Sequence, residues 1–283
     1  MKNHSLKFLT LIFAIFALGQ QGQADPISDL NQKLSAGGSS EKAASLKDFS
    51  QYLTTVNGKV YQSQAIPIFV SNLNDADVNV RRAAIGGLLM ISMTTLPIAN
   101  PSSQPSNTPN IAAYPPAKAA ILTATDDPNI LVRQMALEIY AANYKLTPEV
   151  ENKILAEINA PEPKNPGGPA NHAALLESLM IGRSPSPHVT QFLTNMLDDP
   201  KYGSYVAERI GVDRCPLSGE ALDKLATKLS QETDSSKRAN YARAIGSYGK
   251  QAQQYTPQLR AALANEKDEV TKQNLQAALT RTQ

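Results

Sequence analysis

Apolar residues recur every three or four positions along much of this chain, and the segment from 66 to 91 shows the pattern most clearly. A first apolar stripe contains Ile66, Phe69, Val70 and Leu73. A second stripe follows after a short polar stretch and contains Val80, Ala84, Leu88 and Ile91. Each stripe lies on one face of a helix with 3.6 residues per turn, so each face must be buried. The segment therefore predicts two amphipathic helices joined by a turn.

The starts of these two helices are also predicted by the sequence. Pro67 suits the first turn of a helix, because the N–H that proline lacks would have no acceptor there. We therefore expect the first helix to begin at Pro67. Asp77 precedes the second stripe, where its carboxylate can accept a backbone N–H as an N-cap. Small Ala84 and Gly87 would allow a neighbouring helix to approach closely.

Weaker copies of this helix–turn–helix unit recur along the chain. A second copy contains Pro116, Ile121, Asp127, Asn129, Val132, Arg133, Ala136 and Ile139. Near the C-terminus, the series Leu229, Glu232, Asp234 and Arg238 recurs 34 residues later as Leu263, Glu266, Asp268 and Lys272. A fixed period of this length is typical of solenoids built from stacked helix pairs.

The unit resembles the HEAT-repeat family through the series Pro67, Leu73, Asp75, Asp77, Val80, Arg81, Ala84 and Leu88. The resemblance implies an all-α fold, a right-handed α-solenoid of about six to seven helix pairs. In that family the arginine bonds acidic turn residues of adjacent units. The resemblance thus implies a structural ladder rather than an anion site, made by Asp77, Arg81, Asp127, Arg133, Asp234 and Arg238.

Prolines give an independent count of the units. Seven of them open segments that read as first helices: Pro26, Pro67, Pro116, Pro148, Pro187, Pro216 and Pro257. The middle copies, near 171–181 and 204–210, lack the arginine and are assigned by spacing and apolar pattern alone. Residues 25–57 read as an N-terminal pair whose polar positions, such as Ser45 and Asp48, suit a capping unit exposed to water on one face.

The first 24 residues have a different character. Two lysines precede an apolar run from Leu9 to Leu18, which is followed by a small-x-small sequence that ends at Ala24. This arrangement predicts a cleavable export signal over residues 1–24, with cleavage between Ala24 and Asp25 and a periplasmic or secreted product of a bacterium. Ten apolar residues are too few to span a bilayer.

Residues 25–283 are expected to form a single solenoid domain with two inserted loops. The first loop, 96–116, is rich in proline and polar residues, and the second, 160–169, lies within the fourth unit. Long loops are more often functional than short connections are. Ile111 and Tyr114, which lie beside prolines, are therefore candidate apolar anchors for a partner, and a spacer without function is the alternative.

Composition leaves little room for catalysis. The 283 residues include one cysteine, three histidines and no tryptophan. Nucleophile-elbow, phosphate-loop and zinc-protease motifs are absent from the sequence, and no catalytic residue, cofactor or metal ligand is predicted. Asp75, Asp77 and Asn79 begin like a calcium loop, but valine stands where that loop needs glycine, so a repeat turn is favoured.

Three further groups have a structural and a functional interpretation. His172 and His188 are expected to be surface residues rather than zinc ligands. Tyr241 and Tyr248 share one helical face and are expected in the core, with hydroxyls at its rim, rather than in a ligand site. Cys215 follows Arg214 in a turn and is expected to be a buried, unreactive thiol.

The net charge of residues 25–283 bears on which kinds of partner can bind. Without residues 1–24 the chain has 25 basic and 25 acidic side chains, so neither nucleic acid nor an anionic membrane is expected to bind. The favoured function is an exported, non-catalytic scaffold for a protein or peptide partner. A HEAT-like lyase or ligand-binding protein and a purely structural envelope component are the alternatives.

Overall fold

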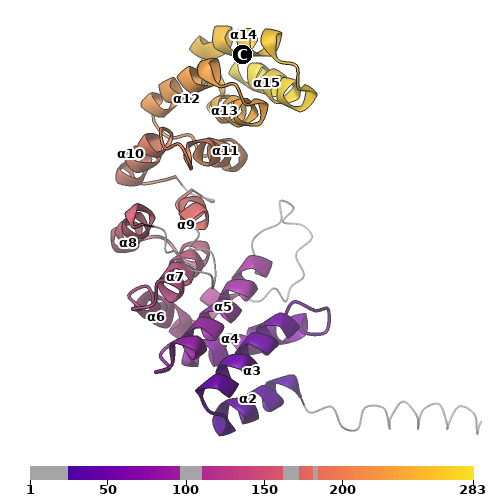
Figure 1. Cartoon of the computed structure of the whole chain (residues 1–283), viewed down its shortest axis with the longest axis vertical. Helices are drawn as coiled ribbons and strands as arrows, with labels where there is room; N and C mark the ends of the chain where they lie inside the picture. The colour runs from indigo at the N-terminus through magenta and orange to yellow at the C-terminus, as the bar shows by residue number, and fades with distance from the viewer. Residues whose placement is uncertain (1–24, 96–109, 162–171, 181–183) are drawn as a thin grey trace, which may run out of the picture. The chain divides into compact units, whose positions relative to one another are not determined.

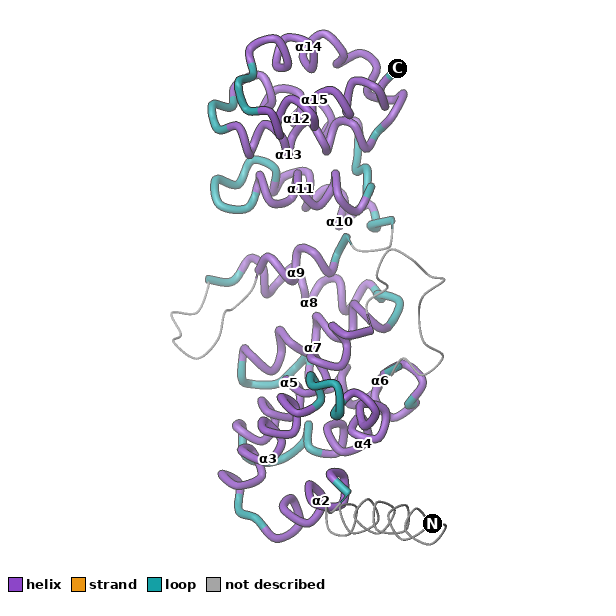
Figure 2. The backbone as a smooth tube through the Cα atoms, turned by 90° about the vertical axis from the view of Figure 1, so that its right-hand side faces the viewer, coloured by secondary structure: helices purple, strands orange, loops and turns teal. Residues whose placement is uncertain are grey.

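The computed structural model describes residues 25–95, 110–161, 172–180 and 184–283. Within these ranges the regular elements are helices and no strand occurs (Figure 2). The predicted export signal over 1–24, most of the first insert (96–109 of 96–116) and most of the second (162–169 of 160–169) lie outside the described residues. No helix in the described ranges is long and apolar enough to cross a membrane.

The described α-helices form seven consecutive pairs along the chain. Their bounds are α2 Pro26–Ala36, α3 Ser39–Tyr52, α4 Gln62–Ser71, α5 Val78–Thr95, α6 Pro115–Ala124, α7 Ile130–Asn143, α8 Pro148–Asn159, α9 His172–Ser178, α10 Pro187–Met196, α11 Gly203–Asp213, α12 Gly219–Gln231, α13 Ser235–Ser247, α14 Thr256–Asn265 and α15 Glu269–Thr282. Short 3₁₀ helices occur at Lys59–Tyr61, Ile111–Ala113 and Gly249–Tyr255. The expectation of an all-α chain of about six to seven helix pairs is confirmed.

The chain divides into two compact units, Met1–Met135 and Ala136–Gln283, and the division falls within α7. The expectation of one uninterrupted domain over 25–283 stays a prediction.

In the first unit, the second helices of successive pairs pack on each other. Helix α3 packs along α5, while α4 contacts both α5 and α6. The predicted stripes are buried, with Phe69, Val80 and Leu88 all at 0% exposure. A Cβ added to Gly87 would lie 2.4 Å from the Phe69 ring, so only glycine allows α4 and α5 to come this close.

The second unit repeats this arrangement. Figure 1 shows α8, α10 and α12 along one side and α9, α11 and α13 along the other. Helix α13 packs between α11 and α15, and α12 contacts both α13 and α14. At Gly246 an added Cβ would lie 2.9 Å from the Cα of Ala278, which shows how closely α13 and α15 approach. Their core is therefore lined by small residues.

Five of the seven predicted prolines stand in the first two positions of a helix, in α2, α6, α8, α10 and α14. Pro216 instead precedes α12, whose N-cap is Ser218. The prediction for Pro67 is wrong, because α4 already begins at Gln62. The buried Gln62 amide donates to the Leu53 carbonyl at 3.0 Å and fixes that earlier start. The carbonyl that Pro67 leaves without an N–H belongs to exposed Ser63, where water can bond it.

The end of the first insert is part of the fold. Residues 111–113 form a 3₁₀ helix that contacts α5 and α6, and the Asn110 side chain accepts the N–H of Ala112 at 2.9 Å. The predicted loop over 96–116 therefore extends too far, because its last residues pack against the first unit.

Candidate interaction site

Arg81 links two helix pairs of the first unit. Its guanidinium donates to the Asp127 carboxylate at 2.6 and 3.1 Å, and to the carbonyls of Asp75 and Ala76 at 3.0 and 3.1 Å. The hydrogen bond to Asp127 raises the pKa of Arg81. The two side chains are only 13% and 6% exposed, so this ion pair is sheltered from water. It joins helix α5 to the turn between α6 and α7.

Arg238 makes the corresponding link in the second unit. It donates to the Glu266 carboxylate at 2.8 Å and to the carbonyls of Glu232 and Thr233 at 3.1 and 2.6 Å. The Glu266 side chain is 1% exposed. Burial alone would raise the pKa of Glu266, but the Asp268 N–H and the Arg238 guanidinium outweigh burial and lower this pKa to about 2. The carboxylate is therefore a well-satisfied buried anion.

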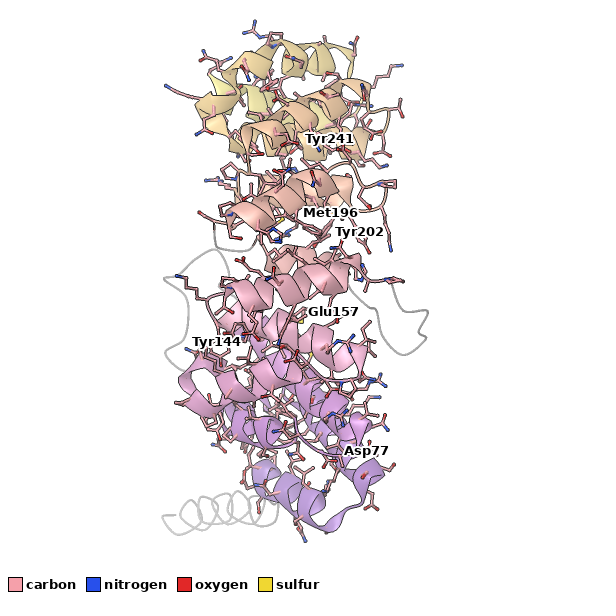
Figure 3. The ribbon with its side chains drawn as sticks, turned by 90° about the vertical axis from the view of Figure 1, so that its left-hand side faces the viewer. Asp77, Tyr144, Glu157, Met196, Tyr202 and Tyr241 are labelled. Atoms are coloured by element: carbon pink, nitrogen blue, oxygen red, sulfur yellow. The ribbon has the colours of Figure 1, made fainter. Side chains whose placement is uncertain are left out.

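The predicted ladder is wrong about two of its acceptors, Asp77 and Asp234, which bond backbone N–H groups instead of the arginines. Arg133 donates to the Asp127 and Pro128 carbonyls at 2.9 and 3.1 Å. Arg81 and Arg238 bond two carbonyls of the turn before their own helices in the same way, and we call this arrangement the arginine bracket. Asp77, visible at the turn before α5 in Figure 3, instead accepts the Asn79 N–H at 2.7 Å. Asp234 likewise accepts the N–H of Lys237 at 2.9 Å.

These two aspartates cap helices because their short side chains reach back to the backbone beside them. In the C-terminal pairs the acidic partner of the arginine is Glu266, a residue that the ladder prediction did not include. The 34-residue recurrence of Glu232 as Glu266 was the signal that could have identified it.

A polar cluster that sequence reasoning missed lies on α7, α9 and α11. Glu177 accepts the Tyr205 hydroxyl at 3.0 Å and pairs with Arg209 at 3.0 Å. Arg209 also pairs with Asp213 at 2.8 Å. Burial, and then the neighbouring charge of Glu177, raises the pKa of Glu138 to about 7. These residues share no repeat spacing, which is why their meeting could not be predicted.

A large, open hollow on the described surface is lined by residues of α2, of α3 and of the segment 52–61. Its volume is about 1690 Å³. We call it the α2–α3 groove. Leu30 and Phe49 form its floor and are buried, whereas Val56 and Val60 are 86% and 73% exposed. The groove thus combines a firm apolar floor with apolar side chains that project into water.

Acidic residues line this groove in excess. Four carboxylates face it, from Asp25, Asp29, Glu41 and Asp48, and one ammonium group, from Lys33. Asp25 caps α2 by accepting the N–H of Ser28 at 3.2 Å, and Glu41 accepts the N–H of Gly38 at 3.1 Å. Asp25 and Glu41 thus bond the backbone at the N-terminal ends of α2 and α3.

The predicted anchor at Ile111 is wrong. Its side chain is fully buried at 0% exposure, so a partner cannot reach it in the folded protein. An isolated isoleucine beside prolines looked exposed in the sequence, but it fills the space between α5 and α6. Tyr114 is half-buried and occupies the N-cap position of α6.

The histidines divide between surface and core. His188 is exposed as expected, but the prediction for His172 is wrong because His172 is only 3% exposed. Its ring lies 6.1 Å from that of Tyr202 and packs as part of the core. In the described ranges no group of three or more histidine, cysteine or acidic side chains is arranged to hold a metal ion.

The tyrosines and the cysteine lie where the structural interpretation put them. Tyr241 and Tyr248 are 5% and 7% exposed, and the Tyr248 hydroxyl accepts the N–H of Leu217 at 3.1 Å. Cys215 is 5% exposed, and burial followed by the charge of Asp213 raises its pKa to about 11. The thiol is therefore protonated at neutral pH.

No family model and no curated protein matches this chain. Solved structures do match it. An engineered protein aligns with 92% of this chain and 68% of its own, at 13% identity and a TM-score of 0.59. A structure described as a conserved phosphorylation switch controlling the interaction between cadherin and β-catenin aligns at 16% identity and a TM-score of 0.55. The fold is a HEAT- or armadillo-like α-solenoid.

The match to that second structure includes 92% of this chain but only 52% of the other, so this chain spans about half its length. A designed armadillo repeat protein also aligns with 91% of the solenoid at 16% identity, with a TM-score of 0.42. At these identities the likeness describes the fold of the solenoid alone.

Proposed function

We propose that this solenoid is an exported, non-catalytic scaffold that binds a protein or peptide partner. The α2–α3 groove is the observation that carries the proposal. It places two highly exposed valines beside a buried apolar floor and a charged rim. Apolar surface rimmed by polar residues is a common mark of a protein interaction site.

The architecture supports the same conclusion. Stacked helix pairs offer long continuous faces, which is how solenoids generally bind extended partners. The β-catenin structure is described through the interaction of that protein with cadherin, and this chain shares its fold. The shared fold makes an interaction scaffold a sound starting point for this chain.

The use of the charged residues supports a non-catalytic role. Arg81, Arg238 and Glu266 tie helix pairs together, while Asp77 and Asp234 cap helices. A catalytic acid or base needs to be within hydrogen-bond reach of a substrate, and these groups are already bonded to the protein.

Export is the second part of the proposal and rests on the sequence of residues 1–24. We expect the chain to be recovered outside the cytoplasm with a new N-terminus at Asp25. Cell fractionation and mass spectrometry of the purified protein test this. Recovery of the intact chain from the cytoplasm alone would contradict export.

Site-specific photo-crosslinking tests the interaction site. A photoreactive amino acid is placed at Val56 or Val60 in the groove, and at Val212 or Val270 as matched controls. The controls are 49% and 64% exposed and lie in the second unit. We expect a discrete protein or peptide adduct from the groove positions only. Equal labelling at all four positions, or none in the groove, would refute this site.

A further inference from the structure

We infer that the α2–α3 groove accepts a partner segment that combines apolar side chains with lysine or arginine. This inference rests on the proposed function and adds to it the chemistry of the partner. Four properties of the groove select that chemistry: its size, its exposed apolar side chains, the sign of the charge around it and its tyrosine rings.

The first property is size. At about 1690 Å³ the groove exceeds the roughly 300–1,000 Å³ usual for small-molecule pockets, and it is open to solvent along its length. A ligand that fills it must reach from the Pro26 end of α2 to residues 56–61. A peptide segment has that reach, whereas a cofactor-sized molecule would leave most of the groove wet.

The apolar contacts favour a partner with aliphatic side chains. Val56 and Val60 are the two most exposed large apolar residues of the described chain. The rings of Tyr52 and Tyr61 lie beside them, with their centroids 6.2 Å apart. Covering an exposed valine removes apolar surface from water, so aliphatic side chains of a partner are stabilised here.

The charge favours a basic partner. The four carboxylates that line the groove outnumber its one ammonium group by three, although the whole precursor has a formal charge of +2. Lys33 pairs with Asp29 at 2.7 Å, which leaves the charges of Asp25, Glu41 and Asp48 uncompensated by any cation lining the groove. Such a rim attracts cationic side chains and repels acidic segments.

The tyrosines can also receive cations. A lysine or arginine that lies over a tyrosine ring gains a favourable cation–π contact. Tyr52 and Tyr61 are half-buried, so each keeps part of its ring accessible. A partner with alternating apolar and basic side chains therefore satisfies both the rim and the floor of the groove.

The experiment compares two fluorescein-labelled 14-residue peptides that share leucines at the same positions. One peptide has lysine and the other glutamate at every remaining position. Binding to the full chain is followed by fluorescence anisotropy, and mass spectrometry records which N-terminus the protein carries. We expect the lysine peptide to bind at least about tenfold more tightly, with an affinity that falls as salt rises.

Matched variants locate the binding. Asp48→Lys should weaken the lysine peptide by about three- to tenfold and not weaken the glutamate peptide. The double variant Val56→Ser with Val60→Ser should weaken both peptides. Glu149→Lys, an exposed position of the second unit, and Val212→Ser with Val270→Ser should change neither. All these positions are on the surface, and circular dichroism confirms that each variant is folded.

The outcomes separate this inference from the proposed function. If photo-crosslinks form at Val56 and Val60 but the glutamate peptide binds as well as the lysine peptide, the groove is an interaction site and the inferred chemistry is wrong. If neither peptide nor any crosslink reaches the groove, both ideas fail. Lysine-peptide binding that Asp48→Lys and the valine variants leave unchanged is general charge attraction and overturns the inference.

Two other occupants would also overturn it. Self-association that the valine substitutions abolish would identify a second copy of the chain in the groove. Peptide binding that is blocked only in molecules retaining residues 1–24 would identify this chain's own N-terminal segment.

Discussion

Two carboxylates of the second unit, Glu266 and Glu138, differ in the hydrogen-bond donors and charges that surround them. Glu266 is almost fully buried, yet two backbone N–H groups and Arg238 bond it and lower its pKa to about 2. Glu138 is half-buried and faces the like charge of Glu177, and its pKa is raised to about 7. Donors, rather than depth, decide whether a sheltered carboxylate stays charged in this solenoid.

Successive helix pairs of this solenoid are joined in two different ways. Where a repeat has the arginine, as at Arg81 and Arg238, one guanidinium bonds its own turn and a carboxylate of the next pair. In the middle repeats, a less regular cluster of Glu177, Tyr205 and Arg209 joins α9 to α11. The regular link satisfies its anion fully, whereas the irregular one leaves Glu138 and Glu177 repelling each other.

Arg238→Ala should have the largest effect on stability. It leaves the buried Glu266 carboxylate without its cation, and we expect a loss of about 3 kcal/mol in the free energy of unfolding at pH 7. Chemical denaturation measures it. Arg260→Ala, at an exposed position of α14, is the control and should change stability by less than about 0.5 kcal/mol. A variant at position 238 as stable as the control would show that Glu266 needs no counter-ion.

The stability loss caused by Arg238→Ala should also depend on pH. Because the folded pKa of Glu266 is about 2 and the unfolded value is near 4.5, its contribution is fully present above pH 4.5. That contribution is lost as the pH falls from 4.5 to about 2. Arg238→Ala removes part of the pKa shift, so the difference from wild type should shrink across that range.

Arg81→Ala should have a smaller effect, about 2 kcal/mol, because the carboxylate that loses its charged hydrogen bonds, Asp127, is 6% exposed whereas that of Glu266 is 1% exposed. Thermal unfolding followed by circular dichroism measures it. Lys59→Ala, at an exposed position of the same unit, is the matched control. If both variants unfold at the wild-type temperature, the link between α5 and the α6–α7 turn contributes nothing.

Glu138→Gln should have the opposite sign. The Glu138 pKa rises from 4.5 unfolded to about 7 folded, so ionisation costs stability progressively from pH 4.5 to about 7 and fully above pH 7. Glutamine cannot ionise, so the variant should be about 1–2 kcal/mol more stable at pH 8 and equal to wild type below pH 4.5. Urea titrations at pH 4 and 8 measure it, with Glu149→Gln as the exposed control. Equal stability at both values would show that Glu138 is not strained.

Cys215 gives the smallest effect, since it concerns reactivity and not stability. It lies two residues after Asp213, and a pKa near 11 instead of 9 leaves about a hundredfold less thiolate at pH 8. We expect a thiol-specific reagent to label the folded protein at least about a hundred times more slowly than the urea-unfolded protein. Equal rates in the two states would show that the turn around Cys215 is open.

Much of the fold was predictable because it depends on periods that the sequence displays. The stripes of 66–91, the helix-opening prolines and the 34-residue recurrence all appear as helix pairs. Ile111 was misplaced because composition identifies a segment that cannot be helical and does not show where its last apolar residue packs. His172 was wrongly predicted to be exposed, because burial of a histidine depends on neighbours from other helices that the local sequence does not show.

The candidate site was less predictable. The sequence identified residues 25–57 as a polar terminal pair, but Val56 and Val60 belong to no stripe and looked like loop residues. They line one groove with Leu30 of α2 and Phe49 of α3, and this juxtaposition depends on the tertiary fold and not on local spacing. Glu138 and Glu177 likewise interact only because α7 and α9 are the second helices of successive pairs, a neighbourhood that local spacing does not reveal.

The arginine bracket has a consequence for how the solenoid opens. Arg238 holds the turn of its own helix pair and a carboxylate of the following pair, so neither pair can unfold without exposing a charge that the other has paired. Thr271 adds a second tie, because its hydroxyl donates to the Ser235 carbonyl at 3.1 Å. The amides of α12 to α15 should therefore exchange with solvent deuterium as one cooperative block, whereas those of α9, which lacks the bracket, open independently and sooner.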